Sequence, residues 1–292
     1  MTLPVPHSSG TQPPSFVLPA DACDAHIHIY DTRFPSIGDP ARVLSQATVA
    51  DYRGLQQRLG CSRTVIVTPT VYGTDNRVTL DAIAQLGPQR ARGVAVLHPD
   101  VDDATLARLH EGGVRGIRFT LFDPATAVTG FDMVAPLAAR IAPLGWHVQL
   151  HWRADQIVAH QALVESLALP IVFDHFARLP HDAGVAHPAF GIVTRLLAAG
   201  RAWVKLSAPY LDDPVPAHGP DSRQAIAAEW AARVPQRLLW GSDWPHPTET
   251  TTKPDDAALL DRLARWLPDA ALRRQVLVDN PAALYGFEPA AS

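Results

Sequence analysis

The sequence predicts a single (β/α)8 barrel, a TIM barrel in which eight parallel strands alternate with eight helices. Short apolar runs of strand length alternate along the chain with alanine- and leucine-rich stretches of helical length. Eight runs of each kind can be counted. The strand candidates are apolar on both faces, which is typical of parallel strands that are covered by helices. We therefore expect an α/β fold built around one closed sheet.

Eight segments have the composition of buried strands. They are residues 22–29, 63–68, 91–97, 114–120, 146–151, 170–175, 202–207 and 237–243. Helices are expected near residues 48–59, 75–86, 103–111, 130–142, 154–168, 187–199, 221–233 and 255–267. A further helical stretch, 269–279, and residues 280–287 follow the eighth unit. We expect these last residues to pack as a C-terminal helical tail.

Residues that end or begin helices support this order. Gly60, Gly87 and Gly200 fall where helices are expected to end. Asp102 suits the start of the third helix, because its side chain can accept a hydrogen bond from a free backbone amide. A doubly wound open sheet is the competing architecture. The first strand is not followed by a glycine-rich dinucleotide-binding loop, so the barrel is favoured.

Composition and charge narrow the class of protein. The proline-rich residues 1–19 predict a flexible N-terminal tail without signal-peptide features, and residues 20–292 are expected to form the barrel. Apolar runs stay far below the roughly 20 residues that a membrane span needs, which predicts a cytoplasmic protein. The net charge of −4 provides no basic surface for nucleic acid. The two cysteines do not suggest a disulfide framework.

Polar side chains at the strand ends indicate where the chemistry lies, because barrel enzymes act at the carboxyl ends of their strands. His26 and His28 stand two residues apart on the first strand, so they point to the same side. Asp243 follows the eighth strand. Other strands end near Thr70, His98, Arg118, His151, His175, Ser207 and His246. Imidazoles and a carboxylate at one barrel end predict a hydrolytic site, with or without a metal.

Arg118 indicates an acidic ligand. A guanidinium in a barrel mouth is costly to desolvate unless it meets an anion, and its planar fork suits a carboxylate. A substrate carboxylate and a protein carboxylate, Asp123 or Asp174, are the two alternatives. Lys205 lies deeper on its strand and is interpreted as structural. Thr70, Tyr72, Tyr210 and Trp244 are expected to line the substrate pocket by their positions.

Several segments resemble the amidohydrolase superfamily, specifically the amidohydrolase-related branch that contains 2-pyrone-4,6-dicarboxylate lactonase and galactarolactone-processing enzymes. They span roughly residues 20–287 in the expected order. The segments are CDAHIHIYD, YGTDNRVTLDAIA, HEGGVRGIRF, GWHVQLHW, PIVFDHFAR and LLWGSDWPHP. The resemblance implies a (β/α)8 barrel and a hydrolase that opens a small lactone.

The resemblance also implies roles for individual residues. In the lactonase, histidines at the positions of His26, His28 and His175 polarise the carbonyl that is attacked. An aspartate at the position of Asp243 activates water. Arg118 matches an arginine that binds a substrate carboxylate. The arginine that corresponds to Arg178 lies close by.

Three departures from the lactonase pattern change the expected substrate. Asp123 and Leu211 stand where the lactonase carries further substrate-binding arginines, and His151 replaces a tyrosine. Each lost arginine removes charge-assisted contacts worth about 1.5–3 kcal/mol. We therefore expect a lactone with one carboxylate, or a sugar lactone, rather than a planar dicarboxylate.

The resemblance leaves two alternatives for the cofactor. The lactonase branch works without a metal, whereas many relatives bind one divalent ion. His26, His28, His151 and Asp243 would together supply three nitrogens and one oxygen, a set suited to zinc or, second, manganese. The expectation is either one divalent cation at these four residues or no cofactor.

Other functions stay open at this point. A metal-dependent decarboxylase of an aromatic or unsaturated acid is the nearest alternative, because relatives with the same His-X-His motif do that chemistry. A ligand-binding barrel without catalysis is a second alternative. A metal-dependent nuclease is disfavoured by the absence of clustered basic residues. The expected partner is a small-molecule lactone, with neither nucleic acid nor membrane, and a homo-oligomer is left open.

Overall fold

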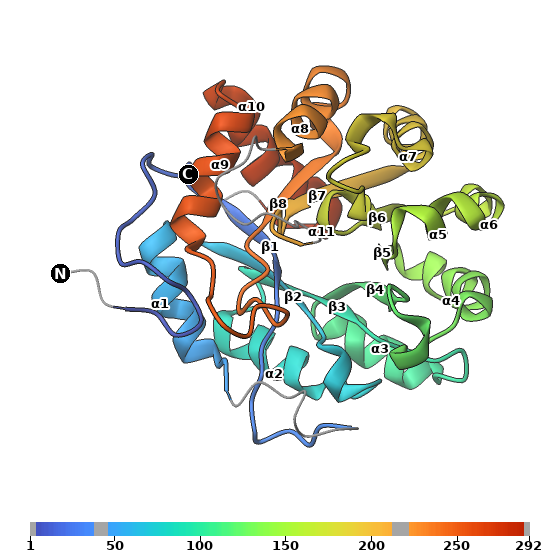
Figure 1. Cartoon of the computed structure of the whole chain (residues 1–292). Helices are drawn as coiled ribbons and strands as arrows, with labels where there is room; N and C mark the ends of the chain where they lie inside the picture. The colour runs from blue at the N-terminus through green and yellow to red at the C-terminus, as the bar shows by residue number, and fades with distance from the viewer. Residues whose placement is uncertain (1–3, 38–45, 212–221, 289–292) are drawn as a thin grey trace.

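The computed structural model describes residues 4–37, 46–211 and 222–288 and confirms the barrel. Eight parallel strands pair in the order in which they occur along the chain (Figure 1). The strands are β1 (Cys23–Ile27), β2 (Arg63–Val67), β3 (Ala91–Ala95), β4 (Val114–Thr120), β5 (His147–His151), β6 (Ile171–Phe173), β7 (Ala202–Ser207) and β8 (Leu238–Gly241). A parallel bridge between Ile27 and Trp244 joins the last strand to the first and closes the sheet.

Helices follow the strands as expected. In the described part of the chain they are α1 (Val49–Leu59), α2 (Arg77–Leu86), α3 (Asp103–Glu111), α4 (Val134–Ile141), α5 (Ala154–Ala159), α6 (Gln161–Ser166), α7 (Pro188–Ala198), α8 (Ser222–Arg233), α9 (Asp256–Trp266), α10 (Ala270–Arg274) and α11 (Asn280–Tyr285). The single helix expected over 154–168 is two helices, α5 and α6. They break at His160, whose backbone leaves the helical region while its ring stacks on Phe131.

The C-terminal tail forms the floor of the barrel. After α10, a wide turn over Gln275–Asp279 leads into α11. Tyr285 and Phe287 then pack against inward-facing apolar residues at the amino ends of the strands, among them Cys23 and Val65. The barrel is thus apolar at this end, and its polar residues gather higher up.

Two local features bring β1 close to β8. The register between β1 and β2 shifts between Asp24 and Ile27, which marks a bulge just where His26 lies. Gly241 of β8 faces the same point. A Cβ atom added to Gly241 would lie 2.6 Å from the Cβ of His26, so only glycine allows this approach. Asp24 lies behind the bulge and accepts from the Ser242 hydroxyl at 2.6 Å.

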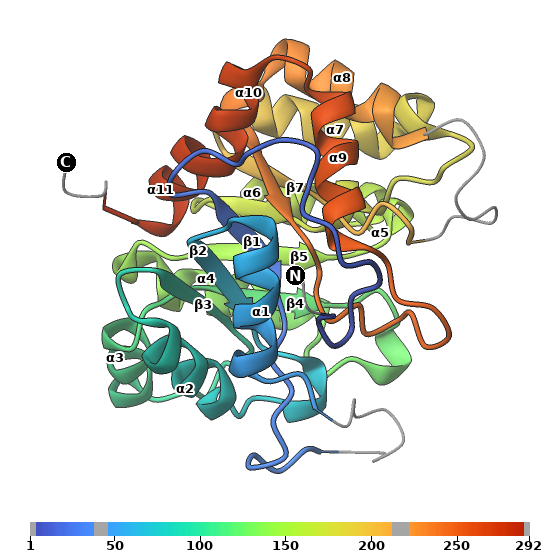
Figure 2. The same cartoon turned by 90° about the vertical axis from the view of Figure 1, so that its left-hand side faces the viewer.

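The described part of the N-terminal segment, residues 4–19, contacts the barrel at a few points, whereas most of its side chains are exposed or half-buried. It runs beside α1 and α9 in both views (Figures 1 and 2). Val5 and Leu18 are buried, and the Trp244 indole donates to the Pro6 carbonyl at 3.0 Å. The prolines keep the segment extended, so its few apolar side chains can insert between the helices.

Across the residues that the structure describes, no helix is both long enough and apolar enough to cross a membrane.

Candidate active site

The two histidines of β1 meet as the sequence predicts. Their Nε2 atoms lie 3.3 Å apart, and both rings are buried. His28 Nδ1 lies 2.8 Å from the Val67 carbonyl. A carbonyl only accepts hydrogen bonds, so Nδ1 carries the hydrogen and the Nε2 lone pair of a neutral His28 points into the site. This second partner also fixes the orientation of the ring.

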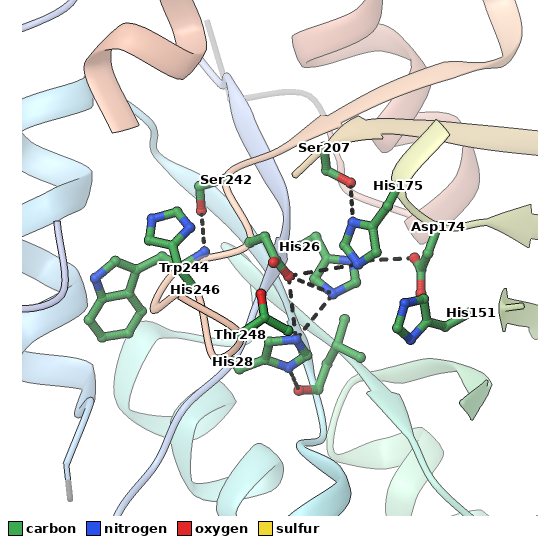
Figure 3. A network of polar contacts seen from close by, with 12 residues as sticks. His26, His28, His151, Asp174, His175, Ser207, Ser242, Trp244, His246 and Thr248 are labelled. Carbon is green, nitrogen blue, oxygen red and sulfur yellow. Dashed lines mark hydrogen bonds and ion pairs between the residues drawn. The ribbon is translucent and has the colours of Figure 1, made fainter. Parts of the chain in front are cut away.

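Three imidazoles converge on Asp243. They belong to His26, His28 and His175, whose rings lie close together in Figure 3. Asp243 Oδ1 lies 3.6 Å from Nε2 of His26, 3.6 Å from Nε2 of His28 and 3.8 Å from Nε2 of His175. His175 Nδ1 is held by the Ser207 hydroxyl at 2.8 Å. Residues from β1, β7 and the loops after β6 and β8 therefore share one buried site, as the sequence predicts.

The backbone around these residues is unusual. Asp243 has a φ of 67°, and His175 begins four successive residues, through Arg178, with φ between 48° and 56°. Non-glycine residues avoid this left-handed region because Cβ crowds the backbone. Such conformations persist where the surrounding structure fixes them and are concentrated at functional sites. Here they turn His175 and Asp243 toward the barrel axis just beyond the strand ends.

A charged layer supports the histidines from below. Lys205 Nζ lies 3.2 Å from His26 Nδ1 and donates to Gln149 Oε1 at 2.8 Å. Asp174 Oδ1 lies 3.3 Å from the same His26 Nδ1. His26 can therefore adopt two tautomers. If Lys205 donates to Nδ1, Nε2 carries the hydrogen; if Nδ1 donates to Asp174, the Nε2 lone pair faces the site.

Burial and neighbouring charges set the protonation of these groups. Burial lowers the pKa of His175 to about 4, and the pKa of His26 lies well below its usual value for the same reason. Burial alone would raise the pKa of Asp243, but the surrounding imidazoles, foremost His175, outweigh it and lower this pKa well below its usual value. Burial lowers the pKa of Lys205 to about 8. At neutral pH the imidazoles of His26 and His175 are thus neutral and Asp243 is a carboxylate.

Arg118 meets a protein carboxylate, the second of the two alternatives given above. Its Nε donates to Asp174 Oδ2 at 2.9 Å, and Gln149 donates to the same oxygen at 3.1 Å. Among the described residues, the two Nη nitrogens of Arg118 have no hydrogen-bond partner. The ion pair therefore fixes the guanidinium while leaving donors for a second anion.

His151 lies outside the group of histidines around Asp243, contrary to the expected four-residue metal set. Its Nε2 accepts from the Arg178 guanidinium at 2.8 Å, which occupies the lone pair that a metal would need. Arg178 is itself placed over the Phe122 ring, 3.9 Å from the ring centroid. His151 still borders the site, because its ring packs edge-on against His175 with 5.2 Å between ring centroids.

Tyr210 reaches the site as expected. Its hydroxyl lies 2.9 Å from Asp243 Oδ2 and 2.8 Å from His246 Nδ1. Tyr72 instead uses its hydroxyl on the backbone of Asp31, accepting from N–H at 2.9 Å and donating to the carbonyl at 3.2 Å. Tyr72 thereby holds the loop after β1. Its hydroxyl is occupied by the Asp31 backbone.

Trp244 does not line the pocket. Its indole is fully buried, packs on Tyr52 with 5.5 Å between ring centroids, and points away from the histidines (Figure 3). It follows Asp243 directly, and the left-handed backbone of Asp243, with a φ of 67°, turns the chain at this point. Thr70 begins a short helical turn, Thr70–Tyr72, where its side chain makes no hydrogen bond within the described chain. His98 binds the Val128 carbonyl at 2.8 Å, outside the group around Asp243.

Sequence reasoning missed Gln149 and Asp256. Gln149 could have been found, because it alternates with His151 along β5 and so faces the barrel interior. Asp256, which faces His246, begins α9 and belongs to none of the segments that carry the family resemblance. Its role depends on a turn that only the folded chain reveals.

The three residues His26, His28 and Asp243 fit a divalent cation. Bonds of about 2.0–2.1 Å at tetrahedral angles place ligand atoms about 3.3–3.4 Å apart. The corresponding separations here are 3.3, 3.6 and 3.6 Å. His28 already presents its Nε2 lone pair, and His26 does so when Nδ1 donates to Asp174. These three residues could therefore hold a metal without large rearrangement.

Comparison with known proteins gives a consistent picture. Residues 23–287 match the amidohydrolase family. A 2-pyrone-4,6-dicarboxylate hydrolase of Comamonas testosteroni is 35% identical over 282 residues, which cover 93% of this chain and 92% of that protein. A 4-sulfomuconolactone hydrolase of Rhizobium radiobacter is 35% identical over 289 residues, which cover 94% and 93%.

A solved structure agrees with these relatives. The crystal structure of an Agrobacterium tumefaciens protein superposes with a TM-score of 0.83 at 27% identity, covering 94% of this chain and 99% of that one. The match extends over nearly the whole barrel and includes the residues around Asp243. The protein is therefore a member of the amidohydrolase family and an enzyme of the hydrolase type.

Proposed function

We propose that the protein opens a small carboxylated or sugar lactone at its ester C–O bond, with water activated by Asp243. The observation that carries this proposal is the convergence of three imidazole Nε2 atoms on one carboxylate oxygen at 3.6–3.8 Å. Asp243 is ionised at neutral pH, so its Oδ1 can accept a proton from a water molecule held beside it. The two relatives described above are named as hydrolases of a pyrone and of a muconolactone.

The reaction follows from the groups present. Oδ1 of Asp243 takes a proton from water, and the hydroxide oxygen adds to the lactone carbonyl carbon. The carbonyl oxygen gains negative charge, which His175 stabilises when it holds its hydrogen on Nε2. His26 contributes in the same way when no metal occupies its Nε2. Lys205 and the Ser207 hydroxyl can each donate to the opposite ring nitrogen and so favour those tautomers. Stabilisation of this kind is often the largest catalytic contribution.

The second half of the reaction returns the proton. The tetrahedral centre collapses, the ring C–O bond breaks, and the alkoxide oxygen takes the proton from Asp243. The products are a carboxylate and an alcohol on one open chain. The proton that the new acid loses passes to solvent, so one water is consumed and the enzyme is regenerated. General-base assistance by Asp243 is expected to contribute roughly 10²–10⁴-fold to turnover.

Arg118 is proposed to select acidic or hydroxylated lactones. Its Nε is engaged with Asp174, and its Nη donors face no described partner. A substrate carboxylate or hydroxyl that reaches these donors gains a charge-assisted contact worth about 1.5–3 kcal/mol. Asp123 and Leu211 supply no cation where the dicarboxylate-specific lactonase has arginines, so one acidic group is favoured over two.

A bound metal remains part of this proposal. One divalent cation, zinc first and manganese second, would be held by His26, His28 and Asp243. When bound it would polarise the lactone carbonyl as a Lewis acid. Elemental analysis of protein purified without chelators tests this part. We expect about one equivalent of metal. Less than a tenth of an equivalent together with full activity would exclude the metal but not lactone hydrolysis.

The proposed reaction is tested with a panel of lactones in water enriched in ¹⁸O. The panel contains 4-sulfomuconolactone, 2-pyrone-4,6-dicarboxylate, a sugar lactone and uncharged valerolactone, each with and without added zinc. Hydrolysis predicts acid release and one ¹⁸O atom in the new carboxylate. Release of carbon dioxide without ring-opened acid would favour a decarboxylase instead. A chain that binds these compounds and transforms none would be a ligand-binding barrel.

A further inference from the structure

A second polar chain reaches Asp243 from the side opposite the histidines. Tyr210 Oη lies 2.9 Å from Asp243 Oδ2, and His246 Nδ1 lies 2.8 Å from the same hydroxyl. His246 Nε2 in turn faces both carboxylate oxygens of Asp256 at 3.2 and 3.3 Å. The imidazole of His246 and the carboxylate of Asp256 are fully buried. This Tyr210–His246–Asp256 chain shares no residue with the histidine group.

The directions of these hydrogen bonds follow from the donors available. A carboxylate only accepts, so the single hydroxyl hydrogen of Tyr210 points to Asp243 Oδ2. The hydroxyl oxygen then accepts from His246 Nδ1–H. Asp256 faces the other ring nitrogen, Nε2, and a carboxylate only accepts. This set of directions therefore requires one further proton, either on His246 Nε2 or on the Asp256 carboxyl group, and that contact holds the imidazole in this orientation. The chain therefore binds one specific oxygen of Asp243 and leaves the other, Oδ1, to the three imidazoles.

The backbone brings the members of the chain together. Asp243 and His246 both lie in the left-handed region, at φ of 67° and 55°, and the His246 amide donates to the Asp243 carbonyl at 2.7 Å. This tight turn points both side chains at the Tyr210 hydroxyl. Backbone strain at two non-glycine residues is kept because the side-chain contacts require it.

The far end of the chain is closed by the N-terminal segment. Arg58 lies 4.0 Å from Asp256 Oδ2 and donates to the Ser8 hydroxyl and, at 2.7 Å, to the Gly10 carbonyl. The Asp256 amide donates to the same Ser8 hydroxyl at 3.4 Å. Asp256, the first residue of α9, is thus held by Arg58 of α1 and by Ser8 of the N-terminal segment. Asp256, His246 and Tyr210 are therefore each held in place by a neighbouring group.

We propose that Tyr210 is the positioning residue of Asp243, and that His246 and Asp256 act through Tyr210. By holding Oδ2, Tyr210 keeps Oδ1 aimed at the water that the proposed hydrolysis uses. The kinetic test of this inference rests on the proposed function. The position of the Asp243 carboxylate in a crystal structure of a Tyr210 variant can be determined without it. Loss of such an outer partner typically costs 10–100-fold in activity.

The test begins with Tyr210→Phe, which removes one oxygen and keeps the ring. On any panel lactone that the wild type opens, we expect kcat to fall about 10–100-fold with KM changed less than about threefold. The matched control is Tyr285→Phe, because the Tyr285 hydroxyl at the barrel floor is buried and has no hydrogen-bond partner in the described chain. The control should keep wild-type kcat. A rise in KM alone for Tyr210→Phe would overturn the proposal.

A double-variant cycle separates positioning from general support. His246→Gln alone should lower kcat about 10-fold or more, with an unchanged melting temperature as evidence of folding. If His246 acts through Tyr210, the double variant should match Tyr210→Phe within about twofold. If the two losses of kcat multiply in the double variant, His246 and Tyr210 act independently, and the proposal that His246 acts through Tyr210 is overturned.

A crystal structure of Tyr210→Phe supplies the structural readout. We expect the Asp243 carboxylate to rotate so that Oδ1 loses its contacts with the three Nε2 atoms. An unmoved carboxylate would overturn the proposal. A wild type that opens no lactone would end the proposed function, and this structure would then decide the positioning role by itself.

Discussion

The barrel buries histidines at both ends, but the polar partners of these histidines differ between the two ends. At the mouth, every ring nitrogen of His26, His28 and His175 lies near a polar atom of the protein. At the floor, neither nitrogen of His147 has a hydrogen-bond partner among the described residues, and its ring packs edge-on against Tyr285. Burial lowers the pKa of His147 to about 3, as it also lowers the pKa values of His26 and His175.

The comparison teaches that burial and a displaced pKa do not by themselves mark a functional histidine. His147 has both properties, yet neither of its ring nitrogens has a hydrogen-bond partner in the described chain. The mouth differs because its imidazoles converge on one carboxylate oxygen and each is oriented by a second partner. Oriented, convergent polar atoms are what catalysis requires.

The largest effect is expected at the point of convergence. Asp243→Asn keeps the shape of the side chain but removes the base, so kcat should fall by roughly 10²–10⁴-fold. Binding of the hydroxy-acid product, measured by calorimetry, should stay within about threefold. Asp123→Asn, which changes an exposed carboxylate on the loop after β4, is the control and should keep full activity. A variant with more than half of the wild-type rate would require another base.

A histidine exchange at each end of the barrel tests the comparison itself. His28→Gln should lower kcat about 100-fold, because a polar partner of the reacting groups is lost. His147→Gln should change kcat less than about threefold. Steady-state kinetics on the same lactone compares the two variants. Equal losses of kcat in the two variants would show that His28 has no catalytic role that His147 lacks, and that both histidines act through folding.

A smaller effect on kinetics is expected when two arginines of β4, Arg118 and Arg115, are compared. Arg118→Met should raise KM for a carboxylated lactone about 10–100-fold and leave KM for uncharged valerolactone nearly unchanged, since only the anion loses a charge-assisted contact. Arg115→Met, at the amino end of β4 where Arg115 binds the His110 carbonyl, is the matched control. A KM for the acidic lactone that stays within a factor of two would contradict substrate binding by Arg118.

The smallest effect concerns stability and pH. The pKa of His147 falls from 6.5 to about 3 on folding, so below pH 6.5 the unfolded chain binds a proton that the folded chain does not. Its contribution to stability is full above pH 6.5 and is lost as the pH falls toward about 3, by up to about 1.4 kcal/mol per pH unit. His147→Gln should flatten this dependence in urea unfolding between pH 7 and 4. If the free energy of unfolding depends on pH in the same way in wild type and variant, the titration of His147 does not contribute to stability.

The fold was predictable because its signals are local and repeated. Apolar runs recur in each of the eight units and helix-ending glycines in several of them, so one misjudged element, such as the broken helix at His160, does not change the architecture. The positions of His26, His28, His175 and Asp243 were predictable for a related reason. Strand ends of a barrel converge, and period-two alternation decides which side chains face inward.

The rest depended on contacts that sequence position does not specify. Trp244 points outward, where its indole donates to the Pro6 carbonyl of the N-terminal segment. His151 reaches the barrel mouth, but Arg178 occupies its Nε2, and that pairing depends on a left-handed turn after β6. Asp256 reaches His246 from the start of another helix. In each case a partner distant in sequence or an unusual backbone angle decides the outcome.

The central claim is that His26 or His28 and Asp243 share one water molecule or ion. A crystal structure at a resolution that places individual waters tests it most directly, with anomalous data to distinguish a metal. The account predicts a water or ion that touches Asp243 Oδ1 and, at the same time, Nε2 of His26 or His28. An Asp243 whose Oδ1 contacts no solvent or ion near either histidine would contradict it.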